Sequence, residues 1–252
     1  MGHPLEIVLE TLASTSLAEI SSNAPLLIRY DQKYATSISR ASRFMQSVGP
    51  DWKVLTIGET CSHRYRTLYY DDLHLRSYHD HVKGRRNRFK IRVRTYEDGT
   101  AYLEVKQKAN RGLTDKKRLQ RPSTAPKQLS NIESNWLSSL LPDIDPHTLA
   151  PTLEVEYERI TLHSLSLAER LTIDHSIRAR VAGDWRTVLE DGVIIESKSG
   201  SVRSRASQNL KLQGIQSVPF SKYCAGLSVV DESIHHRIRA AAEKQVALGF
   251  AT

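Results

Sequence analysis

Ionic side chains, most of them cationic, recur at every second position in each half of residues 89–108, FKIRVRTYEDGTAYLEVKQK. Lys90, Arg92 and Arg94 alternate with apolar residues in the first half, and the second half repeats the pattern with further cations. Because successive side chains of a strand point to opposite faces, each half predicts a strand with one apolar and one ionic face. Cations stacked on one sheet face repel one another unless an anion lies among them. The chemistry that these residues could do is therefore the binding of a polyanion.

The Asp-Gly dipeptide between the two halves predicts a hairpin turn. The two ionic faces coincide only when the loop has an odd number of residues. We therefore expect a three-residue loop, 97–99, with its glycine in the left-handed conformation. This register places Arg92 opposite Glu104 and Lys90 opposite Lys106.

Ionic residues also fall on one parity of three other predicted strands. A solvated outer face explains any single strand of this kind. Five such strands in one chain, mainly cationic, instead favour ionic faces around a common space, where Lys and Arg hold a polyanion and carboxylates hold a divalent ion. The three further sets are Arg29/Asp31/Lys33, Arg170/Thr172/Asp174 and Glu196/Lys198.

Phosphoryl transfer suits such a site, because its catalysis is mostly positioning and charge stabilisation. Arginine binds phosphate through two parallel hydrogen bonds, and lysine acts as a point charge. The histidines form no HExxH motif or metal-ligand cluster, so we interpret them as surface residues. No glycine-rich phosphate loop is present in the sequence.

The composition agrees with an anionic partner. The 252 residues carry a formal net charge of +8, which favours binding of anions. The two cysteines show no metal-ligand spacing, so a reduced, cytoplasmic location is expected. No apolar run approaches the ~20 residues that cross a bilayer, and the N-terminus lacks the basic region of a signal peptide. The basic strands lack interleaved aromatic residues, so no specific nucleic acid is expected as a partner.

The hydrophobic patterning predicts many strands with few intervening helices, which favours an antiparallel α+β fold or barrel over a doubly wound sheet. The expected helices cover residues 5–20, 36–48, 71–79, 128–141, 207–215 and 231–248. The expected strands cover residues 26–34, 65–70, the two halves of 89–108, 152–161, 170–174, 177–182 and 193–198, with 116–118 in a strand or a loop.

Several stretches, in order and spacing, resemble the VTC domain. This is the catalytic domain of the vacuolar transporter chaperone complex, a polyphosphate polymerase within the triphosphate tunnel metalloenzymes (CYTH-like). The resemblance covers roughly residues 29 to 227. The stretches are RYDQKY (29–34), LYYD (68–71) with Tyr78, KIRVRTY (90–96), LEVK (103–106), YER (157–159), RLTID (170–174), IESK (195–198) and PFSKY (219–223).

The resemblance implies an α+β fold, an antiparallel β-barrel tunnel of about eight strands with flanking helices. One domain would fill residues 1–252, with an N-terminal helix in 1–25, the tunnel in 26–230 and a C-terminal helix in 231–252. It also implies transfer of the terminal phosphate of ATP to a growing polyphosphate chain with Mn²⁺ or Mg²⁺. ATP, polyphosphate or triphosphate, and inorganic phosphate would be the ligands. With no transmembrane segment expected, regulation or product translocation would need other proteins, and a membrane partner is one candidate.

Carried over by position, the resemblance implies a wall of phosphate-binding cations, to which the ionic strand faces add Lys90 and Lys198. Lys222 is implied near the reacting phosphates, with Arg92 and Arg94 as further catalytic residues. Glu196 is implied as the metal ligand, and Glu104 either assists the metal or pairs with Arg92, the pairing being favoured. The phosphate-binding set is Lys33, Lys90, Arg92, Arg94, Lys106, Arg159, Arg170 and Lys198, with one of Lys116 and Lys117.

The sequence departs from the family pattern at three positions. Asp31 stands where the family has glutamate, and Pro219 directly precedes Phe220 where an additional lysine occurs in the polymerases. Arg29 replaces the first glutamate of the ExExK motif of the triphosphatase branch, and a site with one carboxylate fewer favours two-metal hydrolysis less. A triphosphatase and a non-enzymatic polyphosphate-binding module remain the alternatives.

The strand at 152–161 carries a second ionic set. Glu154, Glu156 and Glu158 share one parity, whereas Arg159 lies on the other. With Arg159 facing the phosphates, we expect the three glutamates to face solvent.

Overall fold

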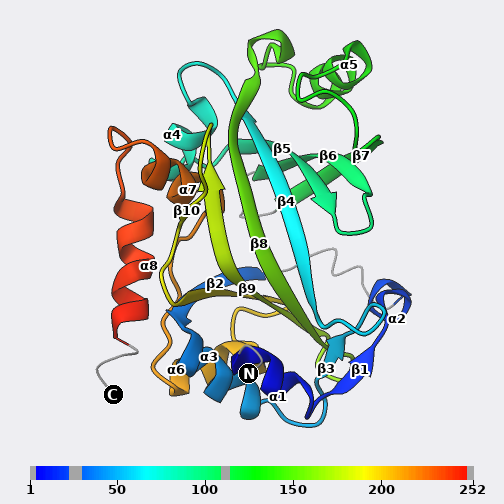
Figure 1. Cartoon of the computed structure of the whole chain (residues 1–252), viewed down its shortest axis with the longest axis vertical. Coiled ribbons are helices and arrows are strands. Elements are labelled where there is room, and N and C mark those ends of the chain that lie inside the picture. Colours follow the sequence, from blue (N-terminus) through cyan, green and yellow to red (C-terminus); the bar gives the residue numbers. More distant parts are fainter. Residues whose placement is uncertain (1–3, 23–29, 109–113, 249–252) are drawn as a thin grey trace.

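The computed structural model describes residues 4–22, 30–108 and 114–248, and within them one eleven-stranded sheet runs through the molecule (Figure 1). Its main path has the order β2-β11-β9-β8-β4-β5-β6-β7, with neighbouring strands antiparallel. β1 pairs in parallel with β3, which extends the edge of β8, and β10 pairs with β9. Flanking helices complete an α+β fold, as expected. The strands are β1 (Ala13–Thr15), β2 (Tyr30–Ser37), β3 (Lys53–Leu55), β4 (Ser62–Asp71), β5 (Arg88–Tyr96), β6 (Ala101–Lys108), β7 (Thr114–Arg121), β8 (Ala150–Ser164), β9 (Glu169–Arg180), β10 (Arg186–Thr187) and β11 (Gly192–Ser199).

The hairpin between β5 and β6 has the predicted register. Its loop is residues 97–99, closed by the hydrogen bond from the Tyr96 amide to the Thr100 carbonyl (2.9 Å), and Gly99 has φ +80°. Only a residue without Cβ adopts this left-handed conformation without strain. The prediction that Arg92 lies opposite Glu104 is confirmed.

The two strands expected at 170–174 and 177–182 are one strand, β9. A register shift against β8 interrupts it, next to Ser176 with a φ of +51°. Such a bulge adds one residue to one strand and changes which parity faces which side. Asp174 and Ile177 therefore face the same side of the sheet, although their spacing in sequence is odd. Because the alternation in the sequence breaks at this bulge, the sequence predicted two strands where the structure has one.

The sheet is open. Within the described residues its two terminal strands, β2 and β7, are not hydrogen-bonded to each other, so the predicted closed barrel is not confirmed. The sheet nevertheless curls far enough to bring its two ends together, because Lys106 of β6 forms an ion pair of 3.2 Å with Asp31 of β2. The face inside this curl is called the inner face below.

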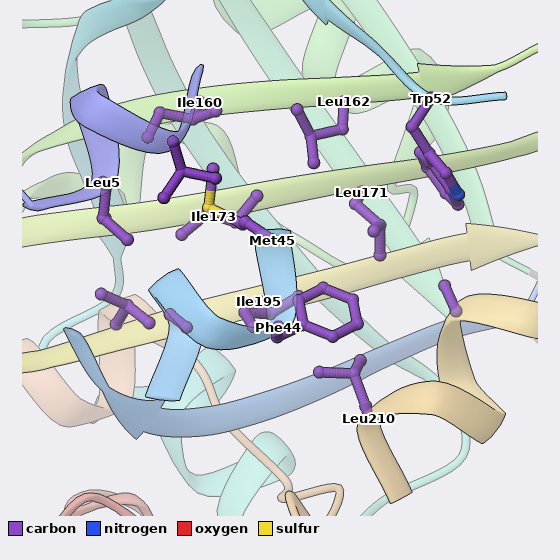
Figure 2. Close-up of a cluster of buried hydrophobic side chains, with 14 of the residues drawn as sticks. Leu5, Phe44, Met45, Trp52, Ile160, Leu162, Leu171, Ile173, Ile195 and Leu210 are labelled. Carbon is purple, nitrogen blue, oxygen red and sulfur yellow. The ribbon is translucent and has the colours of Figure 1, made fainter. Parts of the chain in front are cut away.

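Helices α1, α3 and α6 gather at one end of the molecule and cover the outer face of β8, β9 and β11 (Figure 1). Every second side chain of these strands is apolar, and these side chains pack against the apolar sides of the helices. Figure 2 shows Phe44 and Met45 of α3 pointing at Ile173 and Ile195 of the sheet, all four of them buried. This core fixes the positions of β8, β9 and β11, and the side chains on the other face of these strands point inward. The helices are α1 (Pro4–Leu9), α2 (Leu17–Ser22), α3 (Ile38–Gln46), α4 (Arg76–Val82), α5 (Asn131–Leu140), α6 (Arg205–Leu212), α7 (Lys222–Val230) and α8 (Arg237–Ala247), with a 3-10 turn at Pro146–Thr148.

Helix α7 packs against the inner face and was not predicted. Its backbone approaches the sheet closely, because a Cβ on Gly226 would lie 2.8 Å from Leu153 and 3.0 Å from Ala179. Leu227 is buried in the same apolar cluster. This close contact fixes the position of the helix N-terminus, where Ser221 accepts a hydrogen bond from the Cys224 amide.

The N-terminal helix expected at 5–20 is divided into α1 and α2 by the short strand β1. Ser16 starts the second helix, since its hydroxyl accepts the Glu19 amide at 3.1 Å and Glu19 accepts the Ser16 amide at 3.1 Å. The Ser and Thr residues that fit the helical periodicity thus act as strand and cap residues. The C-terminal helix likewise begins later than expected, at Arg237.

The three glutamates of β8 face outward, as expected, but two of them are not exposed. Glu154 and Glu156 retain 6% of their accessible surface each. Arg180 covers Glu154 with a 2.9 Å ion pair, and Arg66 covers Glu156 with another of 2.9 Å. Neighbouring strands therefore shield these carboxylates with arginines.

No helix in the described ranges is both long and apolar enough to cross a membrane.

Candidate functional site

The inner face of the curled sheet and the N-terminus of α7 enclose a cavity of about 620 Å³. Its walls carry eleven Lys or Arg side chains and three carboxylates, so the cavity is strongly positive. The cations come from six strands and one helix: Lys33 of β2, Arg88, Lys90, Arg92 and Arg94 of β5, Lys106 and Lys108 of β6, Lys116 of β7, Arg159 of β8, Lys198 of β11 and Lys222 of α7.

Most cations chosen from the sequence lie together in this cavity, but two do not. Lys117 is on the opposite face of β7 from Lys116, with a 3.6 Å ion pair to Asp115, because neighbouring strand residues face opposite sides. Arg170 lies beyond the cavity lining, and its guanidinium donates to the Ile20 carbonyl at 3.4 Å. Of the alternative lysines on β7, the structure places Lys116 in the site.

Glu104 lies behind the cavity wall and holds three of its cations. Its carboxylate pairs with Arg92 at 2.8 Å, with Lys116, and with Arg94 at 3.9 Å. Burial raises the pKa of Glu104, but the three cations outweigh burial and bring the pKa down to about 2. The carboxylate is 1% exposed and engaged by cations, so its oxygens do not face an incoming metal ion. The favoured pairing with Arg92 is present.

Asp174 holds Arg159 and Lys222, as Glu104 holds its three cations. Arg159 donates two hydrogen bonds to it, of 2.6 and 2.8 Å, and Lys222 donates a third. Burial raises the pKa of Asp174, yet the neighbouring cations hold it well below its usual range. The Lys222 ammonium also lies 4.3 Å from the centre of the Tyr157 ring. The alternation of residues 170–174 in the sequence already placed Asp174 on an ionic face. Nothing in the sequence showed which cations Asp174 would hold.

Glu196 and Lys33 lie opposite each other on β11 and β2. Glu196 accepts a hydrogen bond from Lys198 at 2.9 Å, and Lys33 donates to the Phe220 carbonyl at 2.9 Å. Burial, followed by repulsion from other cations, lowers the pKa of Lys33 to about 8. Lys33 therefore loses its proton at a much lower pH than an ordinary lysine does.

The N-terminus of α7 brings two more side chains to the cavity. Lys90 donates to the Ser221 hydroxyl at 2.7 Å, and Lys222 follows in sequence. The next residue, Tyr223, donates to the buried carboxylate of Asp71 at 2.7 Å. Ser221 before an apolar run is an N-cap signal that could have revealed this helix.

The histidines are not all surface residues. His63, His163 and His175 are buried, and His81 lines the cavity. Burial and then the nearby cations lower the pKa of His81 to about 2, so its imidazole is neutral at physiological pH.

The carboxylates do not form a metal centre by themselves. Within the part of the chain that the structure describes, no group of three or more His, Cys, Asp or Glu side chains could hold a metal ion. A carboxylate such as Glu196 can still hold a divalent ion together with phosphate oxygens, which is how Mg²⁺ is usually bound in phosphoryl-transfer sites. The donor set thus fits an ion that arrives with a phosphorylated ligand and does not fit a resident ion held by protein alone.

Comparison with known proteins shows what this chain is similar to. A family model described as the VTC domain matches residues 28–231. Among solved structures, a Bacillus halodurans protein provisionally described as an adenylate cyclase is 17% identical with a TM-score of 0.49, over 77% of this chain and 94% of that one. A hypothetical protein is 12% identical with a TM-score of 0.25, over 69% of this chain and 78% of that one. No curated protein sequence matches the chain.

Proposed function

The chain belongs to the VTC domain family, and on this premise we propose that it is a polyphosphate polymerase that transfers the terminal phosphate of ATP to a polyphosphate chain. One observation carries the proposal: cations from six strands and one helix surround a single cavity that can accommodate linked phosphates. No nucleophilic side chain is required, because the acceptor is itself a phosphate oxygen.

The reaction forms a bond between a terminal oxygen of the acceptor chain and the γ-phosphorus of ATP. The bond between that phosphorus and the bridging oxygen of the β-phosphate breaks, and ADP leaves with the electron pair. Charge spreads over the oxygens of the transferred group, and nearby cations stabilise it. We assign this task to Lys222, whose ammonium is oriented by Asp174 and by the face of Tyr157.

Arg92 and Arg94 are proposed to hold the triphosphate. Their guanidinium groups are fixed from behind by Glu104, so they lose little conformational freedom when phosphate binds. Phosphate oxygens can occupy the donors that do not point at Glu104. Lys33, Lys106 and Lys198 line the opposite wall of the same cavity.

Glu196 would hold a Mn²⁺ or Mg²⁺ ion together with oxygens of the triphosphate. Such an ion would neutralise part of the negative charge on the phosphates. Because Glu196 now accepts a hydrogen bond from Lys198, ion binding requires this lysine to turn toward phosphate.

The test is incubation of the purified protein with ATP and Mn²⁺, followed by gel separation of the products by chain length. We expect long chains that an exopolyphosphatase degrades. Release of inorganic phosphate without chain growth would identify a triphosphatase instead, and binding without any turnover would identify a binding module.

Two variants separate the proposed roles. Arg92→Ala should weaken triphosphate binding about tenfold, the effect of losing one charge-assisted contact. Lys222→Ala should reduce turnover by at least that factor and change binding less. Lys244→Ala, an exposed lysine on α8, removes the same charge as a control. Equal loss of binding in Arg92→Ala and Lys222→Ala would contradict the division of roles.

A further inference from the structure

Lys90 differs from most lysines of the cavity in the groups that surround it. Four of the others form an ion pair with a carboxylate, which favours the charged ammonium form. These four are Lys106, Lys116, Lys198 and Lys222. No carboxylate among the described residues forms an ion pair with Lys90. Its strongest electrostatic neighbours are three cations and the Cys224 thiol, and burial raises the pKa of that thiol.

Lys33 and Lys108 form no ion pair with a described residue either, but a nearby carboxylate favours the charged form of each. Glu196 acts in this way on Lys33, and Asp31 acts in this way on Lys108. Burial first, and then the cations around it, lower the pKa of Lys90 to about 7. A large part of Lys90 therefore carries a neutral amine with a free electron pair near neutral pH.

The hydrogen-bond partner of Lys90 fits either form of its amino group. Lys90 lies 2.7 Å from the Ser221 hydroxyl, to which its ammonium donates, and this hydroxyl also accepts the Cys224 amide. A hydroxyl has one hydrogen of its own, so it can donate to the electron pair of a neutral amine. Lys33 instead donates to the Phe220 carbonyl, which can only accept. The contact with Ser221 thus persists when Lys90 loses its proton.

Lys90 is within reach of a ligand in the cavity, and groups that bind phosphate lie beside it. Its side chain is half-buried and lines the cavity. Arg88 and Arg92 are the next residues on the same face of β5, each about 7 Å away along the strand, and both line the cavity as well. A small molecule with a phosphate at one end can therefore bind an arginine and place an electrophilic carbon at Lys90.

We propose that Lys90 is a site of reversible covalent modification by small aldehydes that carry a phosphate group. The amine nitrogen attacks the aldehyde carbon and forms a carbinolamine. The former carbonyl oxygen then leaves as water with the two hydrogens of the amine, and a C=N double bond remains, so nothing is oxidised or reduced. The Ser221 hydroxyl can pass a proton between the nitrogen and this oxygen.

The modified lysine should compete with triphosphate, because the phosphate of the aldehyde takes the donors of Arg92. Such an aldehyde would therefore inhibit the protein until the imine is hydrolysed. This inference goes beyond the proposed function, since it requires that the cavity binds phosphate and does not require that it polymerises phosphate.

The test treats the purified protein with pyridoxal phosphate, reduces the imines with borohydride and maps the modified lysines by mass spectrometry. Lys90 should carry most of the label at the lowest reagent concentrations. Pyridoxal, the same aldehyde without phosphate, should require about tenfold more reagent for equal labelling of Lys90, because one charge-assisted contact is lost. Tripolyphosphate at one hundred times its dissociation constant should suppress this labelling at least about tenfold.

Two variants that keep the charge serve as controls. Lys90→Arg has no amine that forms an imine, so the label should be lost from the cavity, and binding of tripolyphosphate shows that the variant is folded. Lys33→Arg makes the same change at the neighbouring lysine, and labelling of Lys90 should stay within about twofold. Lys244, exposed on α8, should react equally with both aldehydes and should not be protected by tripolyphosphate.

Three results would overturn the inference: label spread evenly over the cavity lysines or placed mainly on Lys33, equal reaction of Lys90 with pyridoxal, and no protection by tripolyphosphate that binds. Labelling is measured without ATP, so failure of the polymerase assay would leave a labelled Lys90 standing. Conversely, chain growth by a protein whose Lys90 stays unlabelled would contradict this inference alone. A protein that binds no tripolyphosphate would contradict the proposed function, and the comparison of the two aldehydes would still decide the inference.

Discussion

At the scale of single residues, the two buried carboxylates Glu104 and Asp174 act on cations of the cavity and not on a ligand. Glu104 and Asp174 are each 1% exposed, and each is engaged by two or more cations. A carboxylate in this position keeps several like charges close together in the absence of phosphate. Arriving phosphates then find guanidinium and ammonium groups already oriented, which lowers the entropy lost on binding.

Replacement of Glu104 by Gln tests this role. The variant leaves Arg92, Arg94 and Lys116 without their common counter-charge, and we expect destabilisation of about 3 kcal/mol, as for the removal of one partner from a buried ion pair. Thermal denaturation should show a melting temperature lower by about 6–12 °C. Saturating tripolyphosphate should recover much of this loss by supplying the missing negative charge. A variant as stable as the original protein would contradict the role.

The buried lysines predict a dependence on pH. Burial lowers the pKa of Lys33 to about 8 and that of Lys90 to about 7, both below the ordinary 10.5. Between those values and 10.5 the unfolded chain binds more protons, so the stability of the ligand-free protein should rise with pH across this range. A bound polyanion favours the charged lysines, so phosphate binding should take up protons and weaken as pH rises above about 7.

Calorimetry of tripolyphosphate binding in two buffers of different ionisation enthalpy measures the proton uptake. Lys90→Arg keeps its charge at every pH used and should take up fewer protons. Unchanged proton uptake in this variant would show that Lys90 is not one of the titrating groups.

At the scale of elements, α7 is the part on which the reacting end of the cavity depends. Its inner end is fixed by Tyr223, whose hydroxyl donates to Asp71, and Asp71 also accepts the Ser77 and Tyr78 amides at the start of α4. Two helices and the end of β4 thus share one buried carboxylate. Lys222 precedes Tyr223 directly, so its position depends on this contact.

The variant Tyr223→Phe should lose about 1.5–3 kcal/mol of stability, the contribution of one hydrogen bond to a charged group at a buried position. Turnover should fall severalfold, whereas the dissociation constant of tripolyphosphate should change little. Tyr78→Phe removes a neighbouring hydroxyl that donates to the His235 carbonyl at 3.2 Å and serves as the control. If both variants reduced turnover equally, the effect would belong to general stability and not to the position of Lys222.

Much of the sheet could be predicted because its cause is local. The hairpin loop, the left-handed Gly99 and the pairing of Arg92 with Glu104 all follow from strand parity and turn chemistry. Lys116 and Lys117 could not be separated in this way, because no turn or partner in the sequence fixed the parity of β7. The register with β6 decides which residues of β7 face the cavity.

Features set by contacts distant in sequence could not be predicted. The bulge at Ser176 hid the continuity of β9, and α7 is apolar on nearly every side because strands β8 and β9 and helices α4 and α8 all contact it. The interior position of His81 likewise depends on the packing of α4. Asp71 looks like an ordinary end of a strand in the sequence, since the Tyr223 hydroxyl that it binds comes from a segment 152 residues away.

At the scale of the whole molecule, charge is concentrated where the sheet curls. The net charge of +8 is a modest total, but eleven cations and three carboxylates line one cavity. Repulsion inside this cavity opposes the curl that brings β6 to β2, and the ion pair between Lys106 and Asp31 acts against this repulsion. An anion of several charges in the cavity should therefore stabilise the entire fold.

Tripolyphosphate at one hundred times its dissociation constant should add about 2.7 kcal/mol to the free energy of unfolding. For a chain of this size that corresponds to a rise in melting temperature of roughly 5–10 °C. Sodium chloride of the same ionic strength should raise it much less, because screening weakens the repulsion without bridging the walls. An equal rise with sodium chloride would show that screening alone accounts for the effect, and no rise with tripolyphosphate would contradict a polyanion cavity. Because the ligand contacts strands from both ends of the open sheet, the rise should be accompanied by slower amide exchange in β2 and β6 together.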